Sequence, residues 1–307
     1  MNESPYKVRS PVVLLVFNRP DTTRAVFEKI AEARPESLYV IADGPRPGYG
    51  EDPELCRQVL EIVSAPSWPC RLVTDISEVN LGTMRRIVSG LDRVFEQEER
   101  AVILEDDCVP DNSFFRFCDE LLHRYAEDNR IAQVSGGNFQ LGRRRTDCSY
   151  YFSRYSHCWG WATWRRAWRC NDADMIHWPD FRDRKRLRDV LDSSREIAYW
   201  EDVLEKVYLG EIDSWACRWL LSCWREHMVN IVPEVNLVSN VGFGPDATRT
   251  TGYSPFAGLP VETMPFPLSH PSDVLPHRLA DEFTSARMFR HPGLVRRVLG
   301  LLGGPRR

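Results

Sequence analysis

The sequence lacks the marks of several common classes of protein. Its nine cysteines are an odd number and form no C-x-x-C pair, so we expect neither a disulfide framework nor a zinc cluster, and we interpret them as reduced thiols of a cytoplasmic protein. No apolar run approaches the roughly 18 residues of a membrane span, and residues 1–11 lack the pattern of a signal peptide. A net charge of -4 gives no general attraction for nucleic acid.

The pattern along the first part of the chain predicts an α/β fold. With 307 residues, of which 43% are hydrophobic, the chain is long enough for one large domain. Short β-branched runs alternate with helical patterns, which is typical of βαβ units stacked into a mixed, mainly parallel sheet with helices on both faces. The expected strands are 12–17, 38–42, 71–74, 101–104 and 131–134.

The regular alternation ends after about residue 140. Five tryptophans crowd the stretch from Trp159 to Trp178, and six arginines without any Asp or Glu follow from position 284. We therefore predict a single domain over 1–283, with halves at 10–140 and 141–255, and a basic amphipathic tail at 284–307.

Three carboxylates follow the fourth predicted strand directly, namely Glu105, Asp106 and Asp107. Adjacent carboxylates repel each other unless a cation compensates them, and open α/β sheets bind ligands at this end of their strands. Hard oxygen ligands suit Mg²⁺ or Mn²⁺ bridged to a diphosphate. We predict Asp107 as the main metal ligand and Asp106 as the next, with Glu105 bonding a ribose or a metal-bound water. The alternative is an ordinary solvated acidic turn.

A second group of candidate residues follows the first two strands. Phe17, Asn18 and Arg19 end strand one, and Asp43 and Gly44 end strand two. An aromatic face, a carboxylate and exposed backbone groups at one sheet edge can hold a base and ribose. Taken singly these residues are ordinary turn formers. Their expected common edge with the carboxylates favours a nucleotide site.

The start of the third helix is a candidate anion site. Asn80 and Gly82 open the helix, and Arg85 and Arg86 add positive charge to its first turn. Free N–H groups and the positive end of the helix dipole favour an anion such as a phosphate. A solvated first turn is the alternative.

The order of these motifs resembles that of a known enzyme family. The matching segments are Phe17-Asn18-Arg19, Ile41-Ala42-Asp43-Gly44, the helix start near Asn80, Ile103 to Asp107 with Phe114-Phe115, Ser135-Gly136-Gly137-Asn138, Gly160-Trp161, Trp168, Val232-Pro233-Glu234-Val235 and Gly242-Phe243-Gly244. In this order they resemble a GT-A-fold glycosyltransferase, most similar to the N-acetylglucosaminyltransferase I group and its bacterial relatives.

The resemblance implies an activity. It implies inverting transfer of a sugar from a UDP-sugar to a glycan or lipid-linked acceptor in polysaccharide assembly, with Mn²⁺ or Mg²⁺ on the diphosphate and Asp43 on the uracil. Residues 10–140 would bind the nucleotide sugar, and 141–255 the acceptor. A carboxylate past the tryptophan-rich loop serves as the base in such families, and Asp213 matches it. An N-cap role for Asp213 is the alternative, and Asp202 and Glu201 are reserve candidates.

Two further features belong to the predicted site. Where many GT-A enzymes carry a histidine, this chain has Arg249, which cannot bind Mn²⁺ but can pair with a diphosphate. Trp159, Gly160 and Trp161 are expected to form part of the acceptor wall, because aromatic faces stack on sugar rings and glycine allows close approach.

Other interpretations remain open at this point. A sugar nucleotidyltransferase also sets acidic residues beside such a sheet, but a glycine-rich basic loop would be expected after strand one, and Phe17 to Pro20 contain no glycine. An inactive carbohydrate-binding protein of the same fold is a rival suggested by Arg249. The tail from Met288 to Arg307 is a candidate for peripheral contact with the inner face of a membrane, with a docked terminal helix as its alternative.

Overall fold

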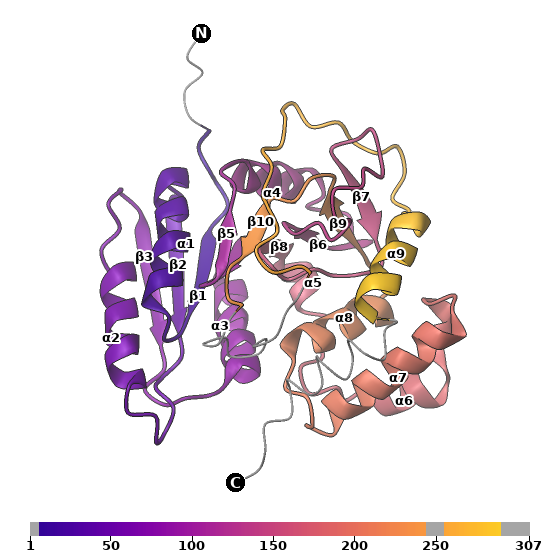
Figure 1. Cartoon of the computed structure of the whole chain (residues 1–307), viewed down its shortest axis with the longest axis horizontal. Helices are drawn as coiled ribbons and strands as arrows, with labels where there is room; N and C mark the ends of the chain where they lie inside the picture. The colour runs from indigo at the N-terminus through magenta and orange to yellow at the C-terminus, as the bar shows by residue number, and fades with distance from the viewer. Residues whose placement is uncertain (1–5, 244–254, 290–307) are drawn as a thin grey trace.

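A computed structural model of the chain describes residues 6–243 and 255–289. Its centre is an eight-stranded sheet with the strand order β3-β2-β1-β4-β8-β6-β9-β7. Helices cover both faces (Figure 1). The predicted α/β class, with a mixed central sheet and flanking helices, is confirmed.

The first four strands along the chain are parallel neighbours in this sheet. Their bounds are β1 Val12–Val16, β2 Ser37–Ala42, β3 Arg71–Ile76 and β4 Arg100–Glu105. The connecting helices are α1 Pro20–Ala33, α2 Asp52–Val63 and α3 Thr83–Gln97.

Strand β1 shows how the layers form, because all five of its residues are buried. Val12 and Leu14 belong to the core cluster that includes α1 and α2, whereas Val13 and Leu15 belong to the cluster that includes α3. Successive side chains of a strand point to opposite faces, so a continuous apolar run requires a helix layer on each side. The same arrangement holds farther along, where α4 (Ser113–Arg124) joins the first cluster and α8 (Trp215–Arg225) joins the second.

The chain after residue 130 completes the sheet with strands of both directions. These are β6 Ile131–Ser135, β7 Tyr150–Ser153, β8 Trp161–Trp164 and β9 Val229–Pro233. Among the described residues, β8 lies antiparallel between β4 and β6, while β9 runs parallel to β6 and antiparallel to β7. The two predicted halves therefore share one sheet, in which β4 has the parallel strand β1 on one side and the antiparallel strand β8 on the other.

This insertion corrects the prediction that Trp161 contacts an acceptor. The side chain begins β8, is 0% exposed and packs among Trp168, Trp215 and Trp219. A side chain without exposed surface cannot stack on a sugar. Trp161 belongs to the core between the sheet and α8.

A small two-stranded ribbon connects distant parts of the chain. Strand β5 (Cys108–Pro110) pairs antiparallel with β10 (Val238–Asn240), so that Asn240 stands opposite Cys108. Because β5 begins directly after the three carboxylates, the pairing brings residues 240–243 beside them.

Most of the remaining helices share a third apolar cluster. They are α6 Trp178–Asp183, the 3-10 turn η1 Arg186–Asp189 and α7 Ser194–Tyr208, joined by part of α8, with the π-type turn η2 Ser285–Phe289 packed against them through Phe289. The short helix α5 Arg165–Trp168 belongs instead to the second cluster, and α9 Arg278–Thr284 packs on β7 and β9 through Ala280. All nine cysteines are free thiols. Within the described residues, each helix is too short or too polar to cross a bilayer.

Candidate active site

A cavity of about 610 Å³ opens at the edge of the sheet where β1, β2 and β4 end. In the parallel register Val16 stands beside Ala42 and Leu15 beside Glu105, so the loops after these strands leave from one edge. The predicted site residues that line the cavity are Phe17, Arg19, Asp43, Asn80, Gly82, Arg86, Glu105, Asp106, Asp107, Trp159 and Asp213.

The strongest electrostatic feature of the cavity is the pair Asp106 and Asp107 with Arg19. The Nη1 atom of Arg19 lies 2.8 Å from Oδ2 of Asp107 and 3.9 Å from Oδ1 of Asp106. The other oxygen of Asp106 accepts a hydrogen bond from the backbone N–H of Phe17 at 3.2 Å. One guanidinium thus faces two adjacent carboxylates, and the local charge remains negative.

Asp106 is the carboxylate whose ionisation this arrangement disfavours most. The residue is only 7% exposed, and burial together with the charge of Asp107 raises the pKa of its carboxyl from 3.8 to about 7, while Arg19 opposes the rise. A buried carboxylate beside a like charge disfavours its ionised form. Near neutral pH the site therefore favours any added cation.

Two residues to which the sequence analysis gave no role in the site shape this pair. Asn240, at the end of β10, donates a hydrogen bond from Nδ2 to Oδ1 of Asp107 at 3.2 Å. A Cβ built on Gly242 would overlap the carboxylate of Asp107, so a larger residue there would force Asp107 to shift. Gly242 was part of the motif resemblance, but its contact with Asp107 depends on the β5–β10 pairing, which no local pattern indicates.

The donor set of this corner fits a hard divalent cation. Asp106 and Asp107 present carboxylate oxygens to the cavity, and oxygen ligands are those that Mg²⁺ and Mn²⁺ prefer. Among residues 6–243 and 255–289, no group of three or more His, Cys, Asp and Glu side chains is arranged as a complete metal site. An ion here would therefore need further oxygens from a ligand such as a diphosphate.

Asp43 lines the cavity but uses its carboxylate to hold a turn. Its Oδ1 accepts from the N–H groups of Gly44 and Leu81, both at 2.9 Å, and its Oδ2 from Nδ2 of Asn80 at 3.1 Å and N–H of Gly82 at 3.0 Å. These four bonds use the lone-pair positions of a carboxylate. Asp43 thus fixes the start of α3 against the end of β2.

Gly44 permits the same close approach. A Cβ on this residue would lie 2.6 Å from the carbonyl carbon of Val79, so any side chain would push the turn away from β2. Gly44 is buried and is not among the residues that line the cavity. In this structure Gly44 packs the turn against Val79 and does not reach the cavity.

The loop after β1 presents an aromatic face to the cavity. Phe17 lines the cavity, and the guanidinium carbon of Arg46 lies 5.4 Å from the centre of its ring. Arg46 is held by buried Asp52, at 2.6 Å from Nε and 2.8 Å from Nη2, and this pairing lowers the pKa of Asp52 to about 2. Asn18 also donates to Asp52, at 2.8 Å, and is not among the cavity-lining residues.

The predicted arginines occupy different positions. Arg86 borders the cavity, but its guanidinium is buried and bonds the Ala42 carbonyl at 3.0 Å and Oδ1 of Asp75 at 3.1 Å. Arg85 points away, because it is exposed and does not line the cavity. Arg249 lies outside the described residues.

A carboxylate stands on the wall contributed by the second half. Asp213 is exposed and lines the cavity together with Glu211, which the sequence did not single out. The N-cap of α8 is Ser214, whose Oγ accepts from the N–H of Cys217 at 3.3 Å. The cap role that was the alternative for Asp213 is thus filled by its neighbour.

The reserve bases lie elsewhere. Asp202 and Glu201 are within α7, and Asp202 pairs with Lys206 at 2.6 Å. Neither borders the cavity.

Aromatic side chains form the wall near residue 159. Trp159 borders the cavity, and its ring centre lies 5.5 Å from that of Phe243 and 4.9 Å from that of Phe139. Gly160 is buried with φ at 61°, and its carbonyl accepts from the N–H of Gly136 at 2.7 Å. Of the three predicted acceptor residues, Trp159 alone reaches the cavity, and Phe243 is added to it.

No protein-family model and no curated protein matches this chain. Similar solved structures include a cytidylyltransferase from Leptospira borgpetersenii, with 10% identity, a TM-score of 0.33, and coverage of 55% of this chain and 65% of that chain. A UDP-glucose pyrophosphorylase complexed with UDP-glucose has 10% identity, a TM-score of 0.29, and coverages of 48% and 63%. The chain thus spans somewhat less than two thirds of each. At this level of similarity neither structure indicates what this chain binds.

Proposed function

We propose that this protein is a glycosyltransferase that moves a sugar from a nucleotide-diphosphate donor, with a UDP-sugar favoured, to a hydroxyl of a glycan or lipid-linked acceptor. The observation that carries the proposal is the composition of the cavity. One side has Asp106, Asp107 and Arg19 at the strand ends, and the second half contributes a separate exposed carboxylate, Asp213.

The strand-end side suits the donor. The face of Phe17, backed by Arg46, offers a stacking surface for a nucleobase. The start of α3 at Gly82 and Thr83 borders the same cavity, and helix N-termini attract phosphate. We assign Asp43 to holding this turn. The uracil contact that the family resemblance implies for Asp43 would require it to give up one of its present hydrogen bonds.

Asp106 and Asp107 would hold Mn²⁺ or Mg²⁺ together with the donor diphosphate. Such a cation, when bound, supplies positive charge to the leaving diphosphate. Arg19 is the resident cation of this corner and is placed to bond either Asp107 or a diphosphate oxygen, because a guanidinium pairs equally well with both groups.

Asp213 would act as the general base. Its carboxylate takes the proton of the acceptor hydroxyl as the acceptor oxygen attacks the anomeric carbon of the donor sugar. The bond from that carbon to the diphosphate oxygen breaks, the electron pair leaves with the diphosphate, and the configuration at the anomeric carbon is inverted. One carboxylate opposite the leaving group is sufficient for this reaction. The aromatic wall of Trp159 and Phe243 would carry the acceptor sugar.

The same carboxylates distinguish this reaction from nucleotidyl transfer. A nucleotidyltransferase joins a nucleoside triphosphate to a sugar phosphate, whose attacking oxygen is already an anion. Asp213 and Glu211 would repel an anionic nucleophile but can accept a proton from a neutral hydroxyl. The geometry therefore favours glycosyl transfer over the nucleotidyltransferase alternative.

The first test measures the binding of UDP, with and without Mn²⁺, through the shift in the melting temperature of the protein. A ligand present at one hundred times its Kd stabilises the fold by about 2.7 kcal/mol, which corresponds to roughly 5 °C for a chain of this size. We expect the shift with UDP and Mn²⁺ together and a much smaller one with either alone. Glycan binding without any nucleotide-dependent shift would instead favour the inactive carbohydrate-binding protein.

The second test separates the base from its neighbour. We expect Asp213→Asn to lower UDP release from UDP-sugars at least 100-fold, the scale of a lost general base, while the melting shift with UDP and Mn²⁺ is retained. Glu211→Gln is the matched control and should change the rate only a few-fold. Release of pyrophosphate from UTP and a sugar 1-phosphate, unaffected by Asp213→Asn, would overturn the proposal in favour of a nucleotidyltransferase.

A further inference from the structure

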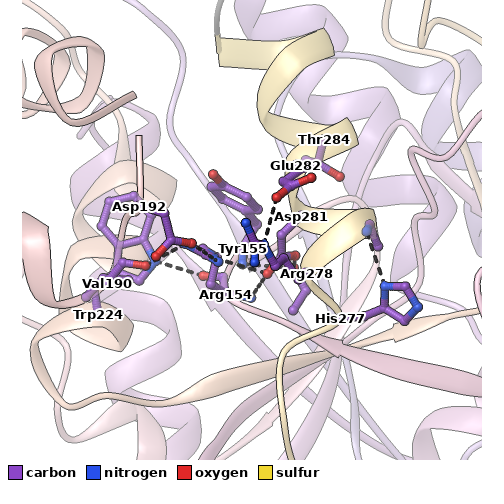
Figure 2. A network of polar contacts seen from close by, with 12 residues as sticks. Arg154, Tyr155, Val190, Asp192, Trp224, His277, Arg278, Asp281, Glu282 and Thr284 are labelled. Atoms are coloured by element: carbon purple, nitrogen blue, oxygen red, sulfur yellow. Dashed lines mark hydrogen bonds and ion pairs between the residues drawn. The ribbon is translucent and has the colours of Figure 1, made fainter. Parts of the chain in front are cut away.

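Helix α9 is fixed to the body of the protein by one face. The buried carboxylate of Asp281 accepts from Oγ of Ser153 at 2.6 Å and from N–H and Nε of Arg154 at 3.1 and 3.2 Å (Figure 2). Ala280 and Thr284 are buried beside it. This network fixes which way the helix faces, so its opposite side points to solvent.

The outward side of α9 carries exposed leucines beside the Arg278–Glu282 ion pair. Leu279 is 62% exposed, and Leu275, just before the helix, is 70% exposed. Residues four apart lie on one face of a helix, which places partly exposed Phe283 beside Leu279. Single exposed leucines are common on soluble proteins, but several together with positive charge indicate an interaction surface.

Positive charge is concentrated around the same ring. The guanidinium carbons of Arg143, Arg145 and Arg287 lie 4.9, 5.0 and 5.4 Å from the centre of Phe283. They come from two segments far apart in the sequence, so the fold itself brings these like charges together. Converging like charges repel each other, and a negatively charged partner relieves that repulsion.

The loop that carries two of these arginines is tied to α9. Nε2 of Gln140 donates to the Ala280 carbonyl at 3.2 Å and to Oγ1 of Thr284 at 2.9 Å. Leu141, the next residue, is 41% exposed. We call the outward residues of these two segments the α9 surface, namely Leu141, Arg143, Arg145, Leu275, Leu279, Phe283 and Arg287.

We propose that the α9 surface docks onto the surface of an anionic lipid bilayer. Leucines enter the boundary between headgroups and acyl chains, and the arginines meet lipid phosphates, which is the combination of signals that peripheral binding needs. The sequence after residue 289 adds five arginines and several leucines and contains no Asp or Glu. Such docking is independent of the proposed reaction.

The test is co-sedimentation of the full chain with vesicles of phosphatidylcholine alone and with 30% phosphatidylglycerol at low salt. We expect binding to the anionic vesicles only. Each arginine near the surface contributes about 1 kcal/mol, or about fivefold in affinity, so Arg143→Gln with Arg287→Gln should weaken binding about 30-fold. The matched control, Arg57→Gln with Arg184→Gln, removes the same charge from exposed arginines elsewhere and should bind like the wild type.

A second variant separates docking from simple charge attraction. Leu275→Ser with Leu279→Ser keeps every charge and should still weaken binding to anionic vesicles several-fold. If the double variant at Arg143 and Arg287 bound anionic vesicles as well as the wild type does, the proposal would be overturned. The tail would then carry the interaction alone. Equal binding to neutral vesicles, or competition by millimolar inorganic phosphate, would also overturn it, the latter because the arginines would then bind a free phosphate. UDP-sugar turnover in solution should be the same in all these variants.

Discussion

The buried carboxylate of Asp106 makes a sharp prediction about stability. Asp106→Asn preserves the shape of the side chain and can keep the hydrogen bond from the backbone N–H of Phe17. It removes one of two adjacent like charges at a position that is 7% exposed. We therefore expect this substitution to stabilise the protein at neutral pH when no divalent cation is present, at the expense of the proposed activity.

The magnitude follows from the raised pKa of Asp106. The difference between the ordinary carboxyl pKa of 3.8 and a value of about 7 corresponds to about 4 kcal/mol as an upper limit. Because the folded-state pKa lies above the unfolded one, this contribution is present at low pH and is lost as the pH rises from about 4 to about 7. Asparagine does not titrate, so the advantage of Asp106→Asn should grow by roughly 2–3 kcal/mol between pH 5 and pH 8.

Urea denaturation in EDTA at pH 5 and pH 8, monitored by tryptophan fluorescence, measures the difference in free energy of unfolding between Asp106→Asn and the wild type. Asp119→Asn is a suitable contrast, because that buried carboxylate accepts hydrogen bonds from Ser10 and Tyr6, and its neutralisation should destabilise the fold. If Asp106→Asn were less stable than the wild type at pH 8, the carboxylate would be well compensated in the fold, and the inference that this corner seeks a cation would be refuted.

Two further predictions concern the geometry around the carboxylates. Gly242→Ala should move Asp107, because the new Cβ would overlap its carboxylate. UDP with Mn²⁺ should then give little melting shift although the protein stays folded. An unchanged shift would show that Asp107 does not contact the ligand. Asp43→Asn should lower the free energy of unfolding by about 1–3 kcal/mol, because an amide cannot accept all four hydrogen bonds, and urea denaturation without ligand would contradict this if the midpoint stayed unchanged.

Much of the first half follows from the sequence alone. The all-apolar run of β1 requires a helix layer on both faces, and the amphipathic pattern of α3 identifies its buried stripe. Parallel strands linked by helices end at one edge, so the meeting of Phe17, Asp43 and Asp106 there is a consequence of local patterns.

Only the tertiary structure decided the rest. Trp161 carries the same local signal as Trp159, yet β8 is inserted antiparallel beside β4 and takes Trp161 into the core while Trp159 stays at the cavity. Asn240 and Gly242 reach Asp107 through a strand pairing that spans more than 100 positions. Likewise Arg143 and Arg287 converge only because α9 packs on the loop at 140. Short-range patterns report which face of an element is apolar, whereas long-range pairing determines which polar groups meet, and that information is not local in the chain.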